Sequence, residues 1–133
     1  MAVNKIVLVL EDLESVRETI GDMLEIKGWV PVLAATSEEA YVKAEEYSPF
    51  CACIDLILDD GTKGEDTAQN LIYKHPHIIT IAVTGMIANF EIGYLREMGF
   101  TDVVLKPFLP DALWTVLDHA YAKSKRWHNL MEG

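Results

Sequence analysis

Three carboxylates, a hydroxyl and an ammonium group stand at the ends of apolar stretches, where together they could support phosphoryl chemistry. Glu11 and Asp12 follow the first stretch, and Asp55, Thr84 and Lys106 close three later ones. Carboxylates held close together repel one another unless a cation joins them, and Mg²⁺ combines one or two carboxylates with water and phosphate oxygens. An ammonium group and a hydroxyl donor can hold a phosphoryl group. The set therefore favours phosphoryl transfer onto Asp55 as the nucleophile.

Each of these residues taken alone also has a structural explanation. An acid after a strand is commonly a helix N-cap or a turn former, and for Asp12 by itself that interpretation is equally good. Threonine at a strand end is commonly structural, and a lysine before a proline, such as Lys106, is commonly a surface charge. The functional hypothesis therefore depends on the joint pattern, five residues at four strand ends.

Continuous apolar runs alternate with amphipathic stretches along the chain. Such runs are typical of strands that are covered on both faces. The predicted strands are Ile6–Leu10, Trp29–Ala34, Phe50–Ile54, Ile78–Val83 and Val103–Leu105. The first predicted helix has an apolar stripe from Leu13 to Leu24 and stops at Gly28, and the second is capped by Thr36 and Glu39 and ends before Pro49. The third and fourth predicted helices are Glu65–Lys74 and Ala88–Met98. The last predicted helix begins at Pro110–Asp111.

This strand–helix order, repeated five times, predicts an α/β fold with a doubly wound, five-stranded parallel sheet between helices. Ligands of such sheets bind beyond the carboxyl ends of the strands, where the strand order reverses. The 133 residues suit one domain, which we place at residues 1–122, with residues 123–133 as a basic C-terminal tail or the start of a linker. The default interpretation of the basic segment Lys123–Trp127 is the cation-rich end of the last helix.

Composition disfavours several classes of protein. With 11 Lys+Arg against 21 Asp+Glu, the net charge of −10 repels phosphate backbones, so we expect no direct nucleic-acid binding. No apolar run approaches the roughly 20 residues that cross a bilayer. The first apolar run of the chain is also too short for the apolar region of a signal peptide. We therefore expect a cytoplasmic protein without membrane contact. Cys51 and Cys53 are expected as buried small hydrophobic residues rather than as a disulfide or a metal pair.

At the residues of this hypothesis, the chain resembles a response-regulator receiver domain, the CheY-like module of two-component signalling. The motifs are the acidic pair in IVLVLED, the acceptor in IDLILDDG, the Thr–small pair in AVTG, and VLKPF. Together they span roughly Lys5 to Tyr121. The resemblance implies a flavodoxin-like sheet with the strand order 2-1-3-4-5.

The resemblance also implies a metal site and a phosphodonor. Asp55 would accept a phosphoryl group from a phosphohistidine on a sensor histidine kinase or a histidine phosphotransfer protein. Asp12 would bind Mg²⁺ directly and Glu11 mostly through water, with Asp55 and the backbone carbonyl of Ile57 completing the protein ligands.

Further roles follow from the same resemblance. Thr84 would bond the phosphoryl oxygen in the active state, with small Gly85 leaving access. Lys106 would pair with the acceptor site, and the Lys106–Pro107 peptide bond would be cis. The protein would be a signalling phosphoacceptor that promotes only its own phosphorylation and dephosphorylation. It would switch a protein-binding surface, with a phosphorylation-linked dimer as one outcome.

Two positions depart from the family pattern. Asp59 stands where receivers usually carry Pro, which predicts a more flexible and more acidic acceptor loop. Val103 stands where a switch Tyr or Phe is usual, so Thr84 cannot rotate together with an aromatic ring in the usual way. These departures support an alternative, a phosphorylation-independent adaptor with the receiver fold that acts through protein–protein contacts.

Enzyme classes with related folds fit poorly. Glu11–Arg17 contains no Gly, which argues against a P-loop NTPase or a flavodoxin. A phosphatase of the haloacid dehalogenase type would need a second Asp where Ile57 stands.

Trp114, at the margin of the last helical stripe, is either a packing residue or part of a docking patch, and packing is the simpler interpretation.

Overall fold

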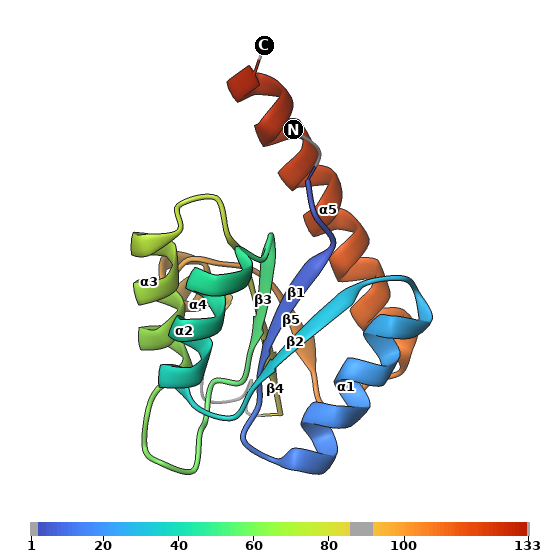
Figure 1. Ribbon diagram of the computed structural model, residues 1–133. Helices are drawn as coiled ribbons and strands as arrows, with labels where there is room; N and C mark the ends of the chain where they lie inside the picture. The colour runs from blue at the N-terminus through green and yellow to red at the C-terminus, as the bar shows by residue number, and fades with distance from the viewer. Residues whose placement is uncertain (1–2, 86–91, 133) are drawn as a thin grey trace.

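A five-stranded parallel sheet runs through the middle of the molecule, with helices on both faces (Figure 1). The computed structural model describes residues 3–85 and 92–132. The strands are β1 (Ile6–Leu10), β2 (Val30–Ala34), β3 (Cys51–Ile54), β4 (Ile79–Thr84) and β5 (Phe100–Leu105), in the spatial order β2-β1-β3-β4-β5. The fold class and the strand order predicted from the sequence are confirmed.

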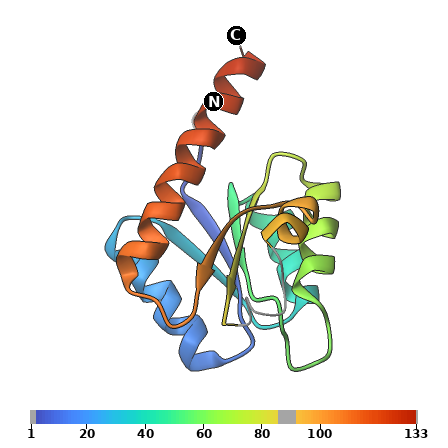
Figure 2. The ribbon, with the colours of Figure 1, turned by 180° about the vertical axis from the view of Figure 1, so that it is seen from behind.

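Helices of two groups cover the two faces of the sheet (Figures 1 and 2). One face carries α1 (Glu14–Ile26) and α5 (Pro110–Glu132), and the other carries α2 (Ser37–Tyr47), α3 (Gly64–Lys74) and α4 (Ile92–Glu97). Of the predicted helix Ala88–Met98, the first residues lie outside the described part of the chain. Within the described ranges, no helix is both long and apolar enough to cross a membrane.

The continuous apolar runs fill two separate cores. Along β1, Val7 and Val9 face α1 and α5, whereas Leu8 and Leu10 face α2, α3 and α4. Neighbouring residues of a strand point to opposite faces, so a strand covered on both sides must be apolar at every position. Cys51 and Cys53 are buried free thiols in the first core, which confirms their interpretation as small hydrophobic residues.

The predicted capping box at the start of α2 is present. The Thr36 hydroxyl accepts a hydrogen bond from the Glu39 N–H at 3.1 Å, and the Glu39 carboxylate accepts one from the Ala35 N–H at 2.9 Å. These contacts satisfy backbone donors that the first turn of a helix leaves without partners. Local sequence thus determines where this helix begins.

The fifth strand begins at Phe100, three residues before the predicted Val103. β5 lies at the edge of the sheet, and its pairing with β4 shifts register between Thr80 and Ile81. Edge strands expose polar side chains to solvent, so Thr101 and Asp102 interrupt the apolar pattern without ending the strand. Val103 is half-buried and packs against the core on the α4 side.

The last helix is a single element that continues past residue 122 to Glu132 and extends beyond the sheet (Figure 2). The basic segment Lys123–Trp127 lies inside α5, and the last turn carries no basic residue, so the expected cation-rich helix end is wrong.

Tyr121 anchors the helix through its hydroxyl, which donates to the Val3 carbonyl at 3.2 Å. Trp114 donates from Nε1 to the Met23 carbonyl at 2.8 Å, which supports the packing interpretation.

Gly64, the first residue of α3, lies directly against the backbone that carries Asp55. A Cβ at Gly64 would come within 2.1 Å of the Asp55 carbonyl oxygen and 2.7 Å of the Leu56 Cα. The Gly64 N–H donates to the Leu56 carbonyl at 3.1 Å, which holds the helix start in this position. A side chain here would displace the segment that positions Asp55.

We expect Gly64→Ala to lower the free energy of unfolding by about 1–3 kcal/mol, because the backbone has to move to admit the methyl group. Gly93→Ala is the matched control, since a Cβ at Gly93 meets no described atom within 4 Å. Alanine in a helix then gains about 0.5–1 kcal/mol over glycine. Urea unfolding of both variants measures the difference, and equal stability of the two would contradict the close approach.

Candidate functional site: an acidic cluster at the carboxyl edge of the sheet

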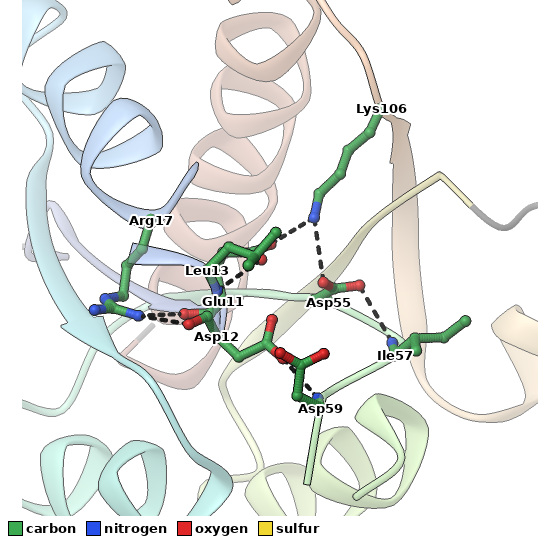
Figure 3. Close-up of polar contacts among 8 residues, drawn as sticks. All are labelled: Glu11, Asp12, Leu13, Arg17, Asp55, Ile57, Asp59 and Lys106. Atoms are coloured by element: carbon green, nitrogen blue, oxygen red, sulfur yellow. Dashed lines mark hydrogen bonds and ion pairs between the residues drawn. The ribbon is translucent and has the colours of Figure 1, made fainter. Parts of the chain in front are cut away.

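The three acids and the lysine of the functional hypothesis meet at one edge of the sheet (Figure 3). Glu11 and Asp12 follow β1, Asp55 follows β3, Thr84 ends β4, and Lys106 follows β5. One carboxylate oxygen from each of Glu11, Asp12 and Asp55 lies within 4.8 Å of the others, so the acids converge as predicted. The chain leaves β1 for the edge strand β2 and returns to β3 beside β1, and this reversal opens the crevice.

Backbone hydrogen bonds extend the sheet by one residue beyond the strands and fix the backbone positions from which these side chains extend. The Asp55 N–H donates to the Leu10 carbonyl at 3.0 Å, and the Glu11 N–H donates to the Ala34 carbonyl at 3.1 Å. The Lys106 N–H donates to the Thr84 carbonyl at 3.0 Å, and the residue Thr84 is fully buried. The acids and the lysine therefore start from defined positions on neighbouring strands.

Lys106 is the cation that joins two of the acids. Its Nζ lies 2.5 Å from Glu11 Oε2 and 3.2 Å from Asp55 Oδ2. Burial lowers the pKa of Lys106, but the carboxylates of Glu11 and Asp55 more than offset this effect and raise its pKa above the ordinary value. Burial raises the pKa of Glu11, and Lys106 offsets only part of that effect. Lys106 therefore offsets only part of the free-energy cost of holding these carboxylates close together.

Both oxygens of the Asp55 carboxylate have partners. Oδ2 faces Lys106, and Oδ1 accepts a hydrogen bond from the Ile57 N–H at 3.2 Å. The carboxylate is therefore held in one orientation, with Glu11 and Asp12 on one side. The Lys106–Pro107 peptide bond is cis, as expected.

Asp12 has a different partner, the Asp59 N–H, which donates to Asp12 Oδ2 at 2.6 Å. Arg17 reaches back from α1 and donates through Nη1 to the carbonyls of Glu11 at 2.8 Å and Asp12 at 3.3 Å. The sequence interpretation identified neither contact. A cation one turn into a helix after an acidic pair could have indicated Arg17, whereas a backbone donor leaves no signal in the side chains.

The chemistry of these donors fits a divalent cation. Three ionised carboxylates and one ammonium group leave a formal charge of −2 at the edge of the sheet. Oxygen ligands with this charge suit Mg²⁺, which prefers carboxylates, water and phosphate oxygens. The roles expected for Thr84, for Lys106 and for the Ile57 carbonyl stay predictions.

Comparison with known proteins gives the family. The family model of the response regulator receiver domain matches residues 7–118. The chain belongs to this family. Receiver domains are the phosphoacceptor modules of two-component signalling, they typically use Mg²⁺ at an acidic pocket, and response regulators act with sensor kinases. The resemblance to receiver domains is thus confirmed, and the roles of the individual site residues stay predictions.

Curated relatives of this receiver include regulatory proteins of bacteria. The Photosynthetic apparatus regulatory protein RegA of Rhodovulum sulfidophilum is 30% identical over 100 residues, which cover 75% of this chain and 54% of RegA. The response regulator VraR of Staphylococcus aureus is 32% identical over 103 residues, which cover 75% of this chain and 48% of VraR. The chain therefore spans about half the length of these relatives.

Solved structures show the same fold at low sequence identity. The CheY-like receiver domain protein of Methanospirillum hungatei JF-1 matches with a TM-score of 0.83 and 20% identity over 94% of this chain and 98% of that chain. NtrX of Brucella abortus matches with a TM-score of 0.88 and 21% identity over 99% of this chain and 29% of NtrX. The receiver fold therefore occurs both as a nearly complete chain and as part of a longer one.

We expect the stability of the receiver to fall, relative to Glu11→Gln, as the pH rises above the ordinary glutamate value of 4.5. The pKa of Glu11 is raised in the folded state, so between 4.5 and the raised value the folded protein binds more protons than the unfolded chain. The free energy of unfolding then decreases with pH. Urea unfolding between pH 4 and 7 without divalent cations measures this, with exposed Glu18→Gln on α1 as the control for loss of one carboxylate. A slope of the opposite sign would show that Lys106 outweighs burial.

Proposed function

We propose that this receiver accepts a phosphoryl group on Asp55 from a phosphohistidine of a sensor histidine kinase or a histidine phosphotransfer protein, with Mg²⁺ in the acidic cluster. The observation that carries the proposal is the position of the Asp55 carboxylate. It lies between Lys106 and the Ile57 N–H, with Glu11 and Asp12 close by. An oriented carboxylate beside a cation and a metal-binding set is the arrangement that acyl phosphate formation needs.

In this mechanism, an oxygen of Asp55 attacks the phosphorus atom as the bond to the histidine nitrogen breaks, and the imidazole, which carries a proton on its other ring nitrogen, leaves with the electron pair of that bond. Lys106 and Thr84 hold the phosphoryl oxygens, and Glu11, Asp12, Asp55 and the carbonyl of Ile57 would hold Mg²⁺. Bound Mg²⁺ supplies positive charge that stabilises the negative charge of the transferring group. The receiver is not otherwise an enzyme and promotes only its own phosphorylation and dephosphorylation.

A hollow beside Lys106 supports docking of a helical phosphodonor. It has a volume of about 430 Å³ and is lined by α1 and the segment that follows β5, with the apolar side chains of Val16, Met23 and Phe108. Lys106 belongs to the same lining, so a donor that filled the hollow would stand next to the acceptor site. An apolar groove of this kind accepts the apolar face of a helix.

Phosphorylation adds about −1.5 to −2 charges to a site that already carries excess negative charge. We propose that the new charge draws Lys106 from Glu11 and biases the loops around Asp55 between two arrangements. Val103 leaves this response without the usual aromatic rotation. The output is a switched protein-binding surface, with a phosphorylation-linked dimer as one form. The protein acts in the cytoplasm, and this domain does not bind nucleic acid directly, in keeping with its net charge of −10.

We further propose that residues 1–122 form the receiver and that residues 123–133 form a basic C-terminal tail or the start of a linker. The family match over residues 7–118 and the extension of α5 beyond the sheet support this division. A phosphorylation-independent adaptor is the second candidate. Val103 in place of the usual aromatic residue favours it, since a receiver without that residue could signal through binding alone.

Wild-type protein should be phosphorylated by acetyl phosphate only when Mg²⁺ is present, and Asp55→Asn should lower the extent at least 100-fold, because the amide nitrogen and oxygen are poor nucleophiles. Intact-protein mass spectrometry measures the added phosphoryl group. Asp60→Asn, in the exposed part of the same loop, is the matched control and should behave as wild type. An equal response of wild type and Asp55→Asn would favour the adaptor.

Thr19→Arg should slow phosphotransfer from a histidine kinase at least tenfold, because a long charged side chain on α1 fills the hollow beside Lys106. The donor is found by testing each autophosphorylated histidine kinase of the source organism with the wild type. Phosphorylation by acetyl phosphate, which needs no docking, should change less than twofold. Thr115→Arg on the exposed side of α5 is the control for the added charge. Equal slowing by both variants would argue against docking in the hollow.

A further inference from the structure

A hydrogen bond between a main-chain N–H and a side-chain carboxylate joins the two loops that carry the acids. The Asp59 N–H, in the segment after β3, donates to Oδ2 of Asp12, which lies 47 residues earlier, at 2.6 Å (Figure 3). A contact of this length to an ionised carboxylate is a charge-assisted hydrogen bond, stronger than one between neutral groups. The side chain of Asp59 itself is exposed, so the contact uses only its backbone.

Asp12 differs from the other acids of the cluster in the group that offsets the negative charge of its carboxylate. Lys106 forms ion pairs with Glu11 and Asp55, whereas no lysine, arginine or histidine within the described ranges forms an ion pair with Asp12. Arg17 contacts only the backbone carbonyl of Asp12. The Asp59 N–H is therefore the group that stabilises and orients this carboxylate.

The segment around Asp59 is built to present this N–H. The Gly61 N–H donates to the Leu58 carbonyl at 3.1 Å, and the Thr62 N–H donates to Asp60 Oδ1 at 2.9 Å. Ile57 and Lys63 form an antiparallel bridge across the base of the loop. The loop is thus closed at its base and turned at its tip, and Asp59 is fixed between these points. Whether it is more flexible than in related receivers stays a prediction.

We propose that the main-chain N–H of Asp59 is a positioning group for the divalent cation site, and the inference rests on the proposed function. By binding Oδ2, it leaves Oδ1 of Asp12 for the cation and fixes the plane of the carboxylate. Hydrogen bonds to a metal-binding carboxylate commonly change metal affinity by about 10–100-fold. The proline that receivers usually carry at this position has no N–H and could not form the contact. The departure at Asp59 therefore supplies a donor to the cluster.

The contact also couples cation binding to the acceptor loop. If the N–H makes the cation bind more tightly by some factor, the bound cation stabilises the hydrogen bond by the same factor, because coupling between two binding events is reciprocal. The segment that begins at Asp55 and passes through Asp59 would then become more ordered when the cation binds.

Isothermal titration calorimetry with Mg²⁺ tests the role of this N–H. Asp59→Pro removes the N–H and should weaken Mg²⁺ binding about tenfold. The conservative variant Asp59→Asn keeps the N–H and loses only the exposed carboxylate, so it should restore binding to within about threefold of wild type. Equal affinity of Asp59→Pro and Asp59→Asn would overturn the inference. Absence of Mg²⁺ binding by the wild type would instead overturn the proposed metal site.

Amide hydrogen exchange on the wild-type protein gives a second test that does not depend on the folding of Asp59→Pro. The Asp59 amide should exchange at least tenfold more slowly than the amide of Asp60, which contacts only the exposed carboxylate of its own side chain among the described residues. It should slow further when Mg²⁺ is added, whereas the Asp60 amide should not. Asp12→Ala should remove the protection. An unprotected Asp59 amide, or one that Asp12→Ala leaves unchanged, would refute the contact as a positioning element.

Discussion

The structure depends on keeping three carboxylates close to one another at the edge of a buried sheet. Glu11, Asp12 and Asp55 would separate if they were free in solution, because like charges repel and burial removes the water that would screen them. The sheet prevents this separation, since β1 and β3 are hydrogen-bonded neighbours and their ends cannot move apart without breaking the ladder. The fold therefore stores unfavourable electrostatic energy at one point, and a divalent cation or a phosphoryl group changes that energy directly.

The three acids are stabilised in three ways. Glu11 shares Lys106 with Asp55, Asp55 also receives the Ile57 N–H, and Asp12 receives a backbone donor from the acceptor loop. Glu11 and Asp55 thus share one partner, and the partners of Asp55 and Asp12 lie in one segment, so a change at one acid reaches the others. The close packing of Gly64 against the Asp55 carbonyl transfers such a change into the start of α3.

The sequence predicts the parts of this arrangement that follow from local patterns. Apolar runs located the central strands, and Thr36 with Glu39 marked the start of α2. Acids at the ends of β1 and β3 predicted the cluster, because the carboxyl ends of parallel strands meet at one edge. The start of β5 was missed, since an edge strand tolerates Thr101 and Asp102 and so lacks a continuous apolar signal. The contact between the Asp59 N–H and Asp12 could not be predicted, because it depends on the path of a loop and not on a side chain.

The length of α5 has a mechanical consequence. The helix begins four residues after Lys106 and runs for 23 residues, or about 35 Å at 1.5 Å per residue. Its middle is pinned where the rings of Trp29, Phe50 and Tyr121 meet, with centroids 5.3 to 5.5 Å apart. The half of α5 near Lys106 is also held in the core, by the buried side chains of Leu113 and Leu117. A displacement of α5 beside the acids would therefore involve the whole helix, including the part that extends beyond the sheet.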